Sequence, residues 1–161
     1  MKLARQILSK KIPSTVGGNL ILRDQLSQHH VLLIFFPFAF EPNSVVNLTQ
    51  LQARLEDLRE WDYLPIGVCP ENIFALNFLA LSLDIDFPLI SDYSLKLSDE
   101  LGLRLEGDTD YSPKVCDAVI AIGRQGEVDY TYCSESRETD FDLDYIIDNL
   151  PQKRCDYCDG Q

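Results

Sequence analysis

The sequence predicts an α/β fold with a central sheet, and two segments carry this prediction. Residues 31 to 36, Val-Leu-Leu-Ile-Phe-Phe, are apolar without a break, rich in branched and aromatic side chains, and end at Pro37. Such a run is typical of a central strand buried on both faces. After a loop, leucines recur at helical spacing at positions 48, 51, 55 and 58. The loop between strand and helix therefore lies at the carboxyl end of the strand, where open α/β sheets usually place their sites.

The rest of the sheet follows from the same kind of pattern. Leu64 to Val68 predicts the next parallel strand, with Cys69 at its end. Residues 114–122 and 127–133 predict a hairpin-like pair around Gly-Arg-Gln-Gly. The other expected elements are a short basic helix within residues 1–12, a strand at 20–22, and helices at 95–103 and 140–150. We expect one domain over residues 1–150 and a tail over 151–161.

Composition limits the class of partner. A chain of 161 residues is long enough to bury a core without metals or disulfides. Lys and Arg number 14 against 26 Asp and Glu, which gives a net charge of -12. This charge repels phosphates, so nucleic acid and anionic membrane surfaces are not expected partners.

Several features indicate a soluble, cytoplasmic protein without a cofactor. The amino terminus is basic but lacks the apolar core and small-residue cleavage site of a secretory signal. No apolar run reaches the roughly 18 residues that a membrane span requires. Five cysteines, an odd number, fit a reducing compartment better than a disulfide framework. The adjacent His29 and His30 suggest no metal site, because neighbouring residues point in different directions.

Four motifs together resemble a known family. Phe-Phe-Pro-Phe-Ala-Phe at 35–40, followed by a polar turn and a helix, is similar to the active-site segment of the peroxiredoxins, the AhpC/TSA branch of the thioredoxin fold. The resemblance continues, in the family's order, at residues 65–72, 84–92 and 119–128, and it covers most of residues 17–148. It implies a thioredoxin-like, peroxiredoxin-type central mixed sheet with helices on both faces.

The resemblance also implies where catalysis would occur. The family's motif is proline, three residues, threonine or serine, two residues and the peroxidatic cysteine, with an arginine from a later strand. Here Pro37 is kept, Glu41 stands at the threonine position, and Ser44 stands at the cysteine position. Asp117 stands at the arginine position in an ungapped alignment. Three of the four positions of this degenerate site therefore lack the chemistry for which the family uses them.

The substitutions all oppose peroxide reduction. That reaction needs a thiolate, whose pKa a helix amino terminus and a nearby cation lower. A serine hydroxyl stays protonated and forms no sulfenic acid. Glu41 and Asp117 would raise the pKa of any thiol placed there. An engineered replacement of a cysteine would account for Ser44 alone, so the two acids favour natural loss.

Ser44 also has a simpler structural explanation. Asn43 or Ser44 is well placed to accept a backbone N–H at the start of the following helix, as an N-cap residue does. This role requires no reactivity.

Residues 73–83 are an unusually apolar helix candidate, in which Asn77 and Ser82 are the polar residues. Helical spacing places Phe74, Phe78 and Leu81 on a different side from Ile73, Leu76 and Ala80, so that one side can face the sheet. The other side must be covered, by extra core, by a second copy of the chain or by another protein. We expect a contact surface that includes Ile73, Phe74, Phe78 and Leu81.

The cysteines leave alternatives open. Cys155 and Cys158 form a CxxC pair in the polar tail, which fits an unreactive tail, a redox pair or half of a zinc site. Cys69 and Cys116 are further redox candidates, Cys116 because it adjoins Asp117. A lone strand cysteine such as Cys133 is more often a small apolar filler.

Two functions therefore remain in view. The first is a non-catalytic redoxin that binds another protein, either a second copy or a member of a larger complex. The alternative is a thiol-dependent peroxidase, disulfide reductase or redox sensor that uses Cys155 and Cys158 or other non-standard cysteines. The substitutions at the family site favour the first.

Overall fold

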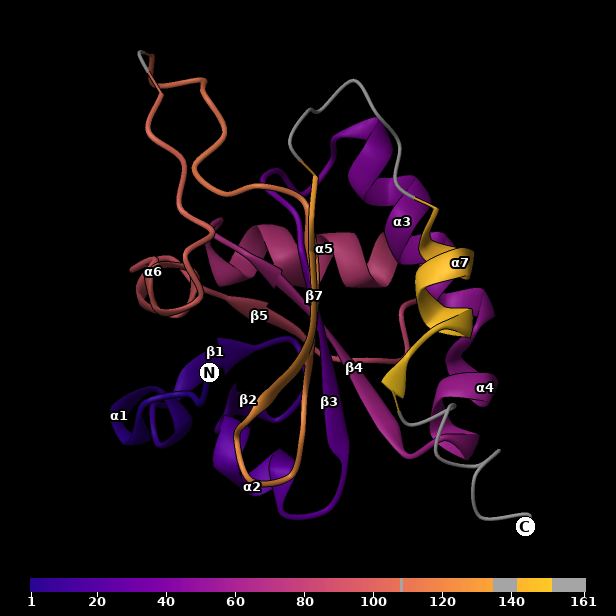
Figure 1. The fold of residues 1–161 in the computed structure, drawn as a ribbon. Coiled ribbons are helices and arrows are strands. Elements are labelled where there is room, and N and C mark those ends of the chain that lie inside the picture. Colours follow the sequence, from indigo (N-terminus) through magenta and orange to yellow (C-terminus); the bar gives the residue numbers. More distant parts are fainter. Residues whose placement is uncertain (108, 135–141, 152–161) are drawn as a thin grey trace, which may run out of the picture.

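A computed structural model describes residues 1–107, 109–134 and 142–151. Within this part of the chain the strands form one mixed sheet in the order β2-β1-β5-β4-β3-β6-β7 (Figure 1). The strands are β1 (Ile12–Ser14), β2 (Gly18–Leu20), β3 (His30–Phe35), β4 (Tyr63–Cys69), β5 (Leu89–Ser91), β6 (Ala118–Ile122) and β7 (Val128–Cys133).

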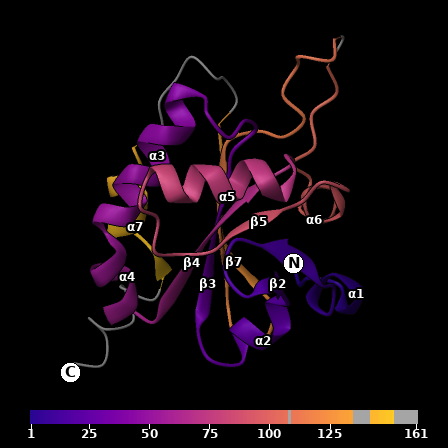
Figure 2. The same cartoon turned by 180° about the vertical axis from the view of Figure 1, so that it is seen from behind.

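Helices cover both faces of the sheet, as Figures 1 and 2 show from opposite sides. One core cluster packs the larger helices against one face, and the other packs the amino-terminal segments and α6 against the opposite face. On the first face lie α3 (Pro42–Ala53), α4 (Leu55–Glu60), α5 (Ile73–Ser82) and α7 (Leu143–Asp148). On the second face lie α1 (Arg5–Leu8), α2 (Leu22–Leu26) and α6 (Lys96–Glu100).

The expected central strand is confirmed. β3 runs parallel to β4 and antiparallel to β6, and every residue from Val31 to Phe36 is at most 1% exposed. Phe35 pairs with Val68 on one side and with Ala118 on the other. The carboxyl ends of β3 and β4 therefore meet the amino end of β6 at one edge of the sheet. The expected antiparallel pair, β6 with β7, is also confirmed.

The start of α3 corrects one prediction. The helix begins at Pro42, with Glu41 as its N-cap residue, so Ser44 lies inside the first turn and the proposed N-cap role of Asn43 or Ser44 is wrong. Proline is favoured at the first helical position because its fixed φ suits the helix and its missing N–H is not needed there. The leucines at helical spacing are divided between α3 and α4, because the helix breaks at Arg54.

Other elements are shorter than predicted or shifted along the chain. The amino-terminal helix is limited to four residues, β2 ends at Leu20, and Leu22 already begins α2. α6 stops at Glu100, before Gly102 with its positive φ. Of the predicted helix 140–150, residues 140 and 141 lie outside the described residues. The described part begins with Asp142, whose side chain accepts the Tyr145 N–H as an N-cap.

No helix in the described ranges is both long and apolar enough to span a membrane.

Candidate functional site

The loop after β3 positions the family-type site. Pro37 is buried directly after the strand, and Ser44 lies one turn into α3. Ser44 is fully buried, and its hydroxyl has no hydrogen-bond partner in the described part of the chain. A buried hydroxyl without a partner is costly. The polarity of Ser44 therefore contributes nothing to the stability of this helix.

Glu71 holds this loop against the neighbouring strand, a role that the sequence patterns did not reveal. Its Oε2 accepts the backbone N–H of Ala39 at 2.8 Å. Its own carbonyl accepts the Ser91 hydroxyl at 2.6 Å, which connects it to β5. The sequence did offer one signal, which is the position of Glu71 two residues after the end of β4. The carboxyl ends of neighbouring parallel strands share one edge of the sheet.

Asp117 lies at the same edge. Because Phe35 pairs with Ala118, the residue before Ala118 stands beside the end of β3. Its side chain is buried, and Oδ1 has no hydrogen-bond partner among the described residues. Burial raises the pKa of Asp117. The structure thus brings an acid, rather than a cation, to the edge where Pro37 and Ser44 also lie.

A cavity of about 240 Å³ opens beside Pro37. Lys114, three residues before Asp117, is the cation in its lining, and sequence reasoning did not single it out. The lining combines the loops after β3 and β4 with the segment that precedes β6: Pro37, Phe38, Pro70, Glu71, Asn72, Tyr93, Asp110, Ser112 and Lys114.

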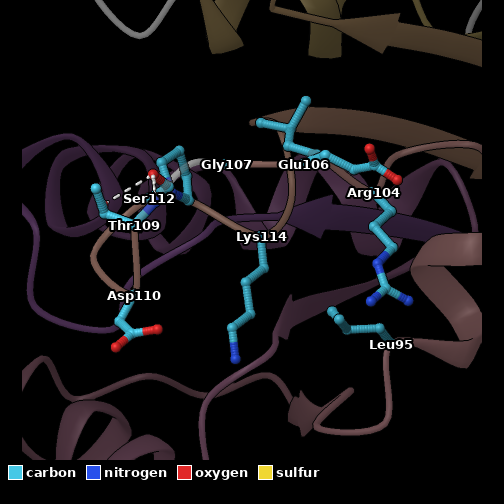
Figure 3. Close-up of a pocket in the computed structure, with 10 residues that line it drawn as sticks. Leu95, Arg104, Glu106, Gly107, Thr109, Asp110, Ser112 and Lys114 are labelled. Atoms are coloured by element: carbon cyan, nitrogen blue, oxygen red, sulfur yellow. Dashed lines mark hydrogen bonds between the residues drawn. The ribbon is translucent and has the colours of Figure 1, made fainter.

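A second cavity, of about 710 Å³, adjoins the loop between α6 and β6 (Figure 3). Asp110, Ser112 and Lys114 line both cavities. Arg104 and Lys114 extend in the same general direction, and Glu106 and Asp110 add two acids to the lining. Because cations and anions both line this cavity, its charge favours neither anionic nor cationic ligands.

The described thiols are poorly suited to act alone. Cys69 is fully buried, and burial raises its pKa well above the ordinary range. Cys116 is 6% exposed, and burial, with the neighbouring Cys133, raises its pKa to about 12. Cys133 is exposed. The pair Cys155 and Cys158 lies outside the described residues.

The two histidines have different surroundings. His29 Nδ1 lies 2.9 Å from Asp62 Oδ1, and Arg124 pairs with the other oxygen of the same carboxylate. The His30 ring instead packs at 5.5 Å from the ring of Tyr63. Within the described ranges no three His, Cys, Asp or Glu residues cluster as metal ligands would.

The outer side of α5 exposes several large apolar side chains. Phe74, Phe78 and Leu81 are 80%, 63% and 76% exposed, and Phe40 from the loop before α3 is 51% exposed. The rings of Phe40 and Phe78 lie 5.7 Å apart. We call these four residues the α5 patch. Leu76 and Leu79 are buried, which confirms the expected division of the helix into two sides. Ile73 is half-buried against the core, because it lies on the inner side.

The mixed sheet with helices on both faces and a loop-to-helix site after its central strand defines a thioredoxin-like fold of the peroxiredoxin type. The model of the AhpC/TSA family matches residues 4–131, and the chain belongs to that family.

Two curated peroxiredoxins are similar to part of this chain. Peroxiredoxins of Pyrococcus horikoshii and Pyrococcus furiosus are 28% and 29% identical over 115 residues, which is 64% of this chain and 53% of each relative. The chain therefore spans about half the length of these relatives.

Solved structures extend the likeness in fold. The bacterioferritin comigratory protein of Xanthomonas campestris has a TM-score of 0.79 at 15% identity and covers 91% of this chain and 93% of its own. Peroxidoxin BcpB of Mycobacterium tuberculosis also has a TM-score of 0.79, at 21% identity, with 96% and 97% covered. These matches establish the fold.

Proposed function

We propose that this member of the AhpC/TSA family is a non-catalytic redoxin that binds another protein through the α5 patch. The observation that carries the proposal is the exposure of Phe40, Phe74, Phe78 and Leu81 beside one another on the surface. The proposal has two parts: the family-type site does not reduce peroxide, and the patch is a binding surface.

The chemistry around Ser44 supports the first part. We assign Ser44 to the position of the peroxidatic cysteine, since it lies in the first turn of the helix that follows the central strand. Ser44 carries a hydroxyl in place of the thiol that peroxide reduction needs. The hydroxyl is also buried, so peroxide cannot reach it. Asp117, at the arginine position, would oppose an anion in this corner of the sheet. A thiolate would lack the cation that the family places at this strand position to lower its pKa.

The α5 patch supports the second part. Burying an exposed Phe or Leu contributes about 1.5 to 3 kcal/mol, so a few such side chains are enough for a specific contact. Aromatic side chains, including Phe, are enriched at protein interfaces relative to the rest of the surface. Residues 73–82 carry no charge, so a partner can cover them without desolvating an ion.

Charge indicates what kind of partner would fit. Asp84 and Asp86 follow α5 and are exposed, and the whole chain carries a net charge of -12. Complementary charge steers association and selects partners. We therefore propose a partner with an apolar centre and a basic rim.

The test compares the natural chain with Phe78→Asp, and Tyr145→Asp is the matched control. Tyr145 is 66% exposed on α7, so both variants place a charge at an exposed aromatic position. Sizing with light scattering detects self-association, and affinity capture followed by binding of the purified partner detects another protein. We expect salt-sensitive binding that Phe78→Asp weakens at least tenfold and that Tyr145→Asp preserves. Equal binding by both variants, with folding unchanged in circular dichroism, would refute the binding surface.

Family membership favours a second candidate, a thiol-dependent oxidoreductase that uses cysteines away from Ser44. Cys155 and Cys158 would be its reactive pair. Counting free thiols before and after treatment with peroxide, followed by turnover measurements with a thiol reductant, distinguishes the two functions. Catalytic turnover that Cys155→Ser abolishes would favour the oxidoreductase.

A further inference from the structure

We infer that Cys116 and Cys133 form a dithiol site between neighbouring strands, which a low-molecular-weight disulfide oxidises to an intramolecular Cys116–Cys133 bond. The site is separate from Ser44, from the CxxC pair of the tail and from the α5 patch. It would make the chain responsive to the thiol–disulfide balance of its surroundings whether or not the α5 patch binds a partner.

Strand register brings the two cysteines to one face. β6 and β7 are antiparallel, and Ala118 pairs with Cys133. Successive side chains alternate between the faces of a strand, so Cys116, two residues before Ala118, shares a face with Cys133. Diagonal neighbours of this kind have Cα atoms about 7 to 8 Å apart, so a bond between the two sulfurs requires a small backbone movement. The Ser134 N–H donates to the Asp117 carbonyl at 2.9 Å and keeps the two segments paired beyond the last strand residues.

The two thiols are neighbours that differ in their access to solvent. Cys133 is among the causes that raise the pKa of Cys116, through hydrogen bonding and charge, which places the two side chains near one another. The Cys133 thiol also donates to the Ser134 carbonyl at 3.9 Å. Cys133 is exposed, whereas Cys116 is 6% exposed. Cys133 is the last residue of β7, and Cys116 lies two residues before β6 begins, where the backbone can make the adjustment that disulfide geometry requires. In this arrangement the accessible Cys133 can attack a small disulfide, and the buried Cys116 can then displace the second small thiol from Cys133.

The reaction balances in two exchange steps. The Cys133 thiolate attacks one sulfur of the small disulfide, breaks its S–S bond and releases one thiol, leaving a mixed disulfide on Cys133. Cys116 then loses its proton to solvent and attacks the Cys133 sulfur, which releases the second thiol. Two protein thiols are oxidised, and one small disulfide is reduced to two thiols.

The surroundings of Cys116 determine the pH dependence of the second step. Burial, together with the hydrogen bond to Cys133 and its charge, raises the pKa of Cys116 to about 12. The thiolate is the attacking species, so its fraction falls about tenfold for each pH unit below that pKa. Closure is therefore slow at neutral pH and speeds up as pH rises. Conversion of Cys133 to the mixed disulfide removes two of the causes that hold this pKa high.

The experiment treats the reduced full chain with oxidised glutathione, traps free thiols by alkylation and maps the linked peptides by mass spectrometry. We expect a Cys116–Cys133 peptide whose formation accelerates about tenfold per pH unit between pH 7 and 9. The double variant Cys155→Ser/Cys158→Ser should retain the link, which excludes exchange through the tail. Cys69, fully buried, is the internal control and should stay free.

Single variants establish the order of the steps. Cys116→Ser should accumulate glutathione on Cys133, and Cys133→Ser should leave Cys116 alkylated as a free thiol. Two free thiols after prolonged oxidation, or a chain that stops with glutathione on Cys133 while Cys116 stays free, would overturn the inference. So would a link from either cysteine to the tail in place of the mutual one. None of these outcomes depends on Phe78, so they are independent of the proposed binding function.

Discussion

Replacing Ser44 by alanine should stabilise the chain, although serine stands where the family keeps its reactive residue. Ser44 lies in the first turn of α3, is fully buried and has a hydroxyl without a hydrogen-bond partner in the described part of the chain. Removal of the oxygen eliminates a buried polar atom and breaks no hydrogen bond among the described residues.

The magnitude follows from three contributions. A buried polar group without a partner costs about 1 to 3 kcal/mol. Alanine is also the better helix former, by up to about 0.5 kcal/mol. The small void left by one oxygen takes back a few tenths of a kcal/mol, at about 24 cal/mol per Å³. We expect Ser44→Ala to raise the free energy of unfolding by roughly 1 to 2 kcal/mol. For a chain of this size, each kcal/mol raises Tm by about 2 to 4 °C.

Denaturant and thermal unfolding measure this change, and Ser98→Ala is the matched control. Ser98 is also a buried helical serine, but its hydroxyl donates to the buried Asp92 carboxylate at 2.6 Å. Loss of that bond should destabilise the chain by about 1.5 to 3 kcal/mol. If Ser44→Ala destabilises to the same extent as Ser98→Ala, Ser44 has a partner that matters and our account of its environment is wrong.

Three other substitutions test separate parts of the structure. Asp117→Asn tests the effect of the raised pKa of Asp117, which in the folded chain lies above the usual 3.8. The stability that protonated Asp117 contributes is fully present below pH 3.8 and is lost as the pH rises through the folded pKa. The variant should be more stable than the natural chain at pH 7 in urea unfolding, and the difference should vanish towards pH 3; a constant difference would exclude titration of Asp117. Arg54→Met should cost roughly 1 to 2 kcal/mol in the same assay, because Arg54 joins α3 to α7 through Asp144 and Asp148; no change would mean that these ion pairs are negligible. Gly67→Ala should cost about 1 to 3 kcal/mol of thermal stability, because its Cβ would stand 2.5 Å from Leu89 Cδ2; an unchanged Tm would show that Leu89 can move aside.

Much of the sheet could be predicted because its signals are local. The unbroken apolar run of residues 31–36 indicated a strand buried on both faces, and the alternation of α5 between core and surface followed from helical spacing alone. The boundary of α3 was missed because Ser44 and Asn43 are common N-cap residues, while Pro42 also favours the first helical position. The N-cap preference of Asn43 and Ser44 competes with the preference of Pro42 for the first helical position. Pro42 takes that position, and Glu41 is therefore the N-cap residue.

The site was only partly predictable, because its contacts join distant segments. Pro37, Ser44 and Asp117 came from a motif, and the strand pairing explains why they share an edge. The bond from Ala39 to Glu71 and the position of Lys114 beside Pro37 depend on loops brought together by the sheet. That Cys116 and Cys133 share one face likewise depends on antiparallel register, which a single sequence does not specify.

The account of the family-type site is tested most directly by the steady-state consumption of hydrogen peroxide with dithiothreitol as reductant. The natural chain and a variant with all five cysteines replaced by serine should consume peroxide at the same background rate. Ser44→Cys alone should gain little, because Asp117 still opposes a thiolate. Turnover that persists in the cysteine-free variant and disappears with Ser44→Ala, or strong recovery on Ser44→Cys alone, would contradict the conclusion that this site does not reduce peroxide.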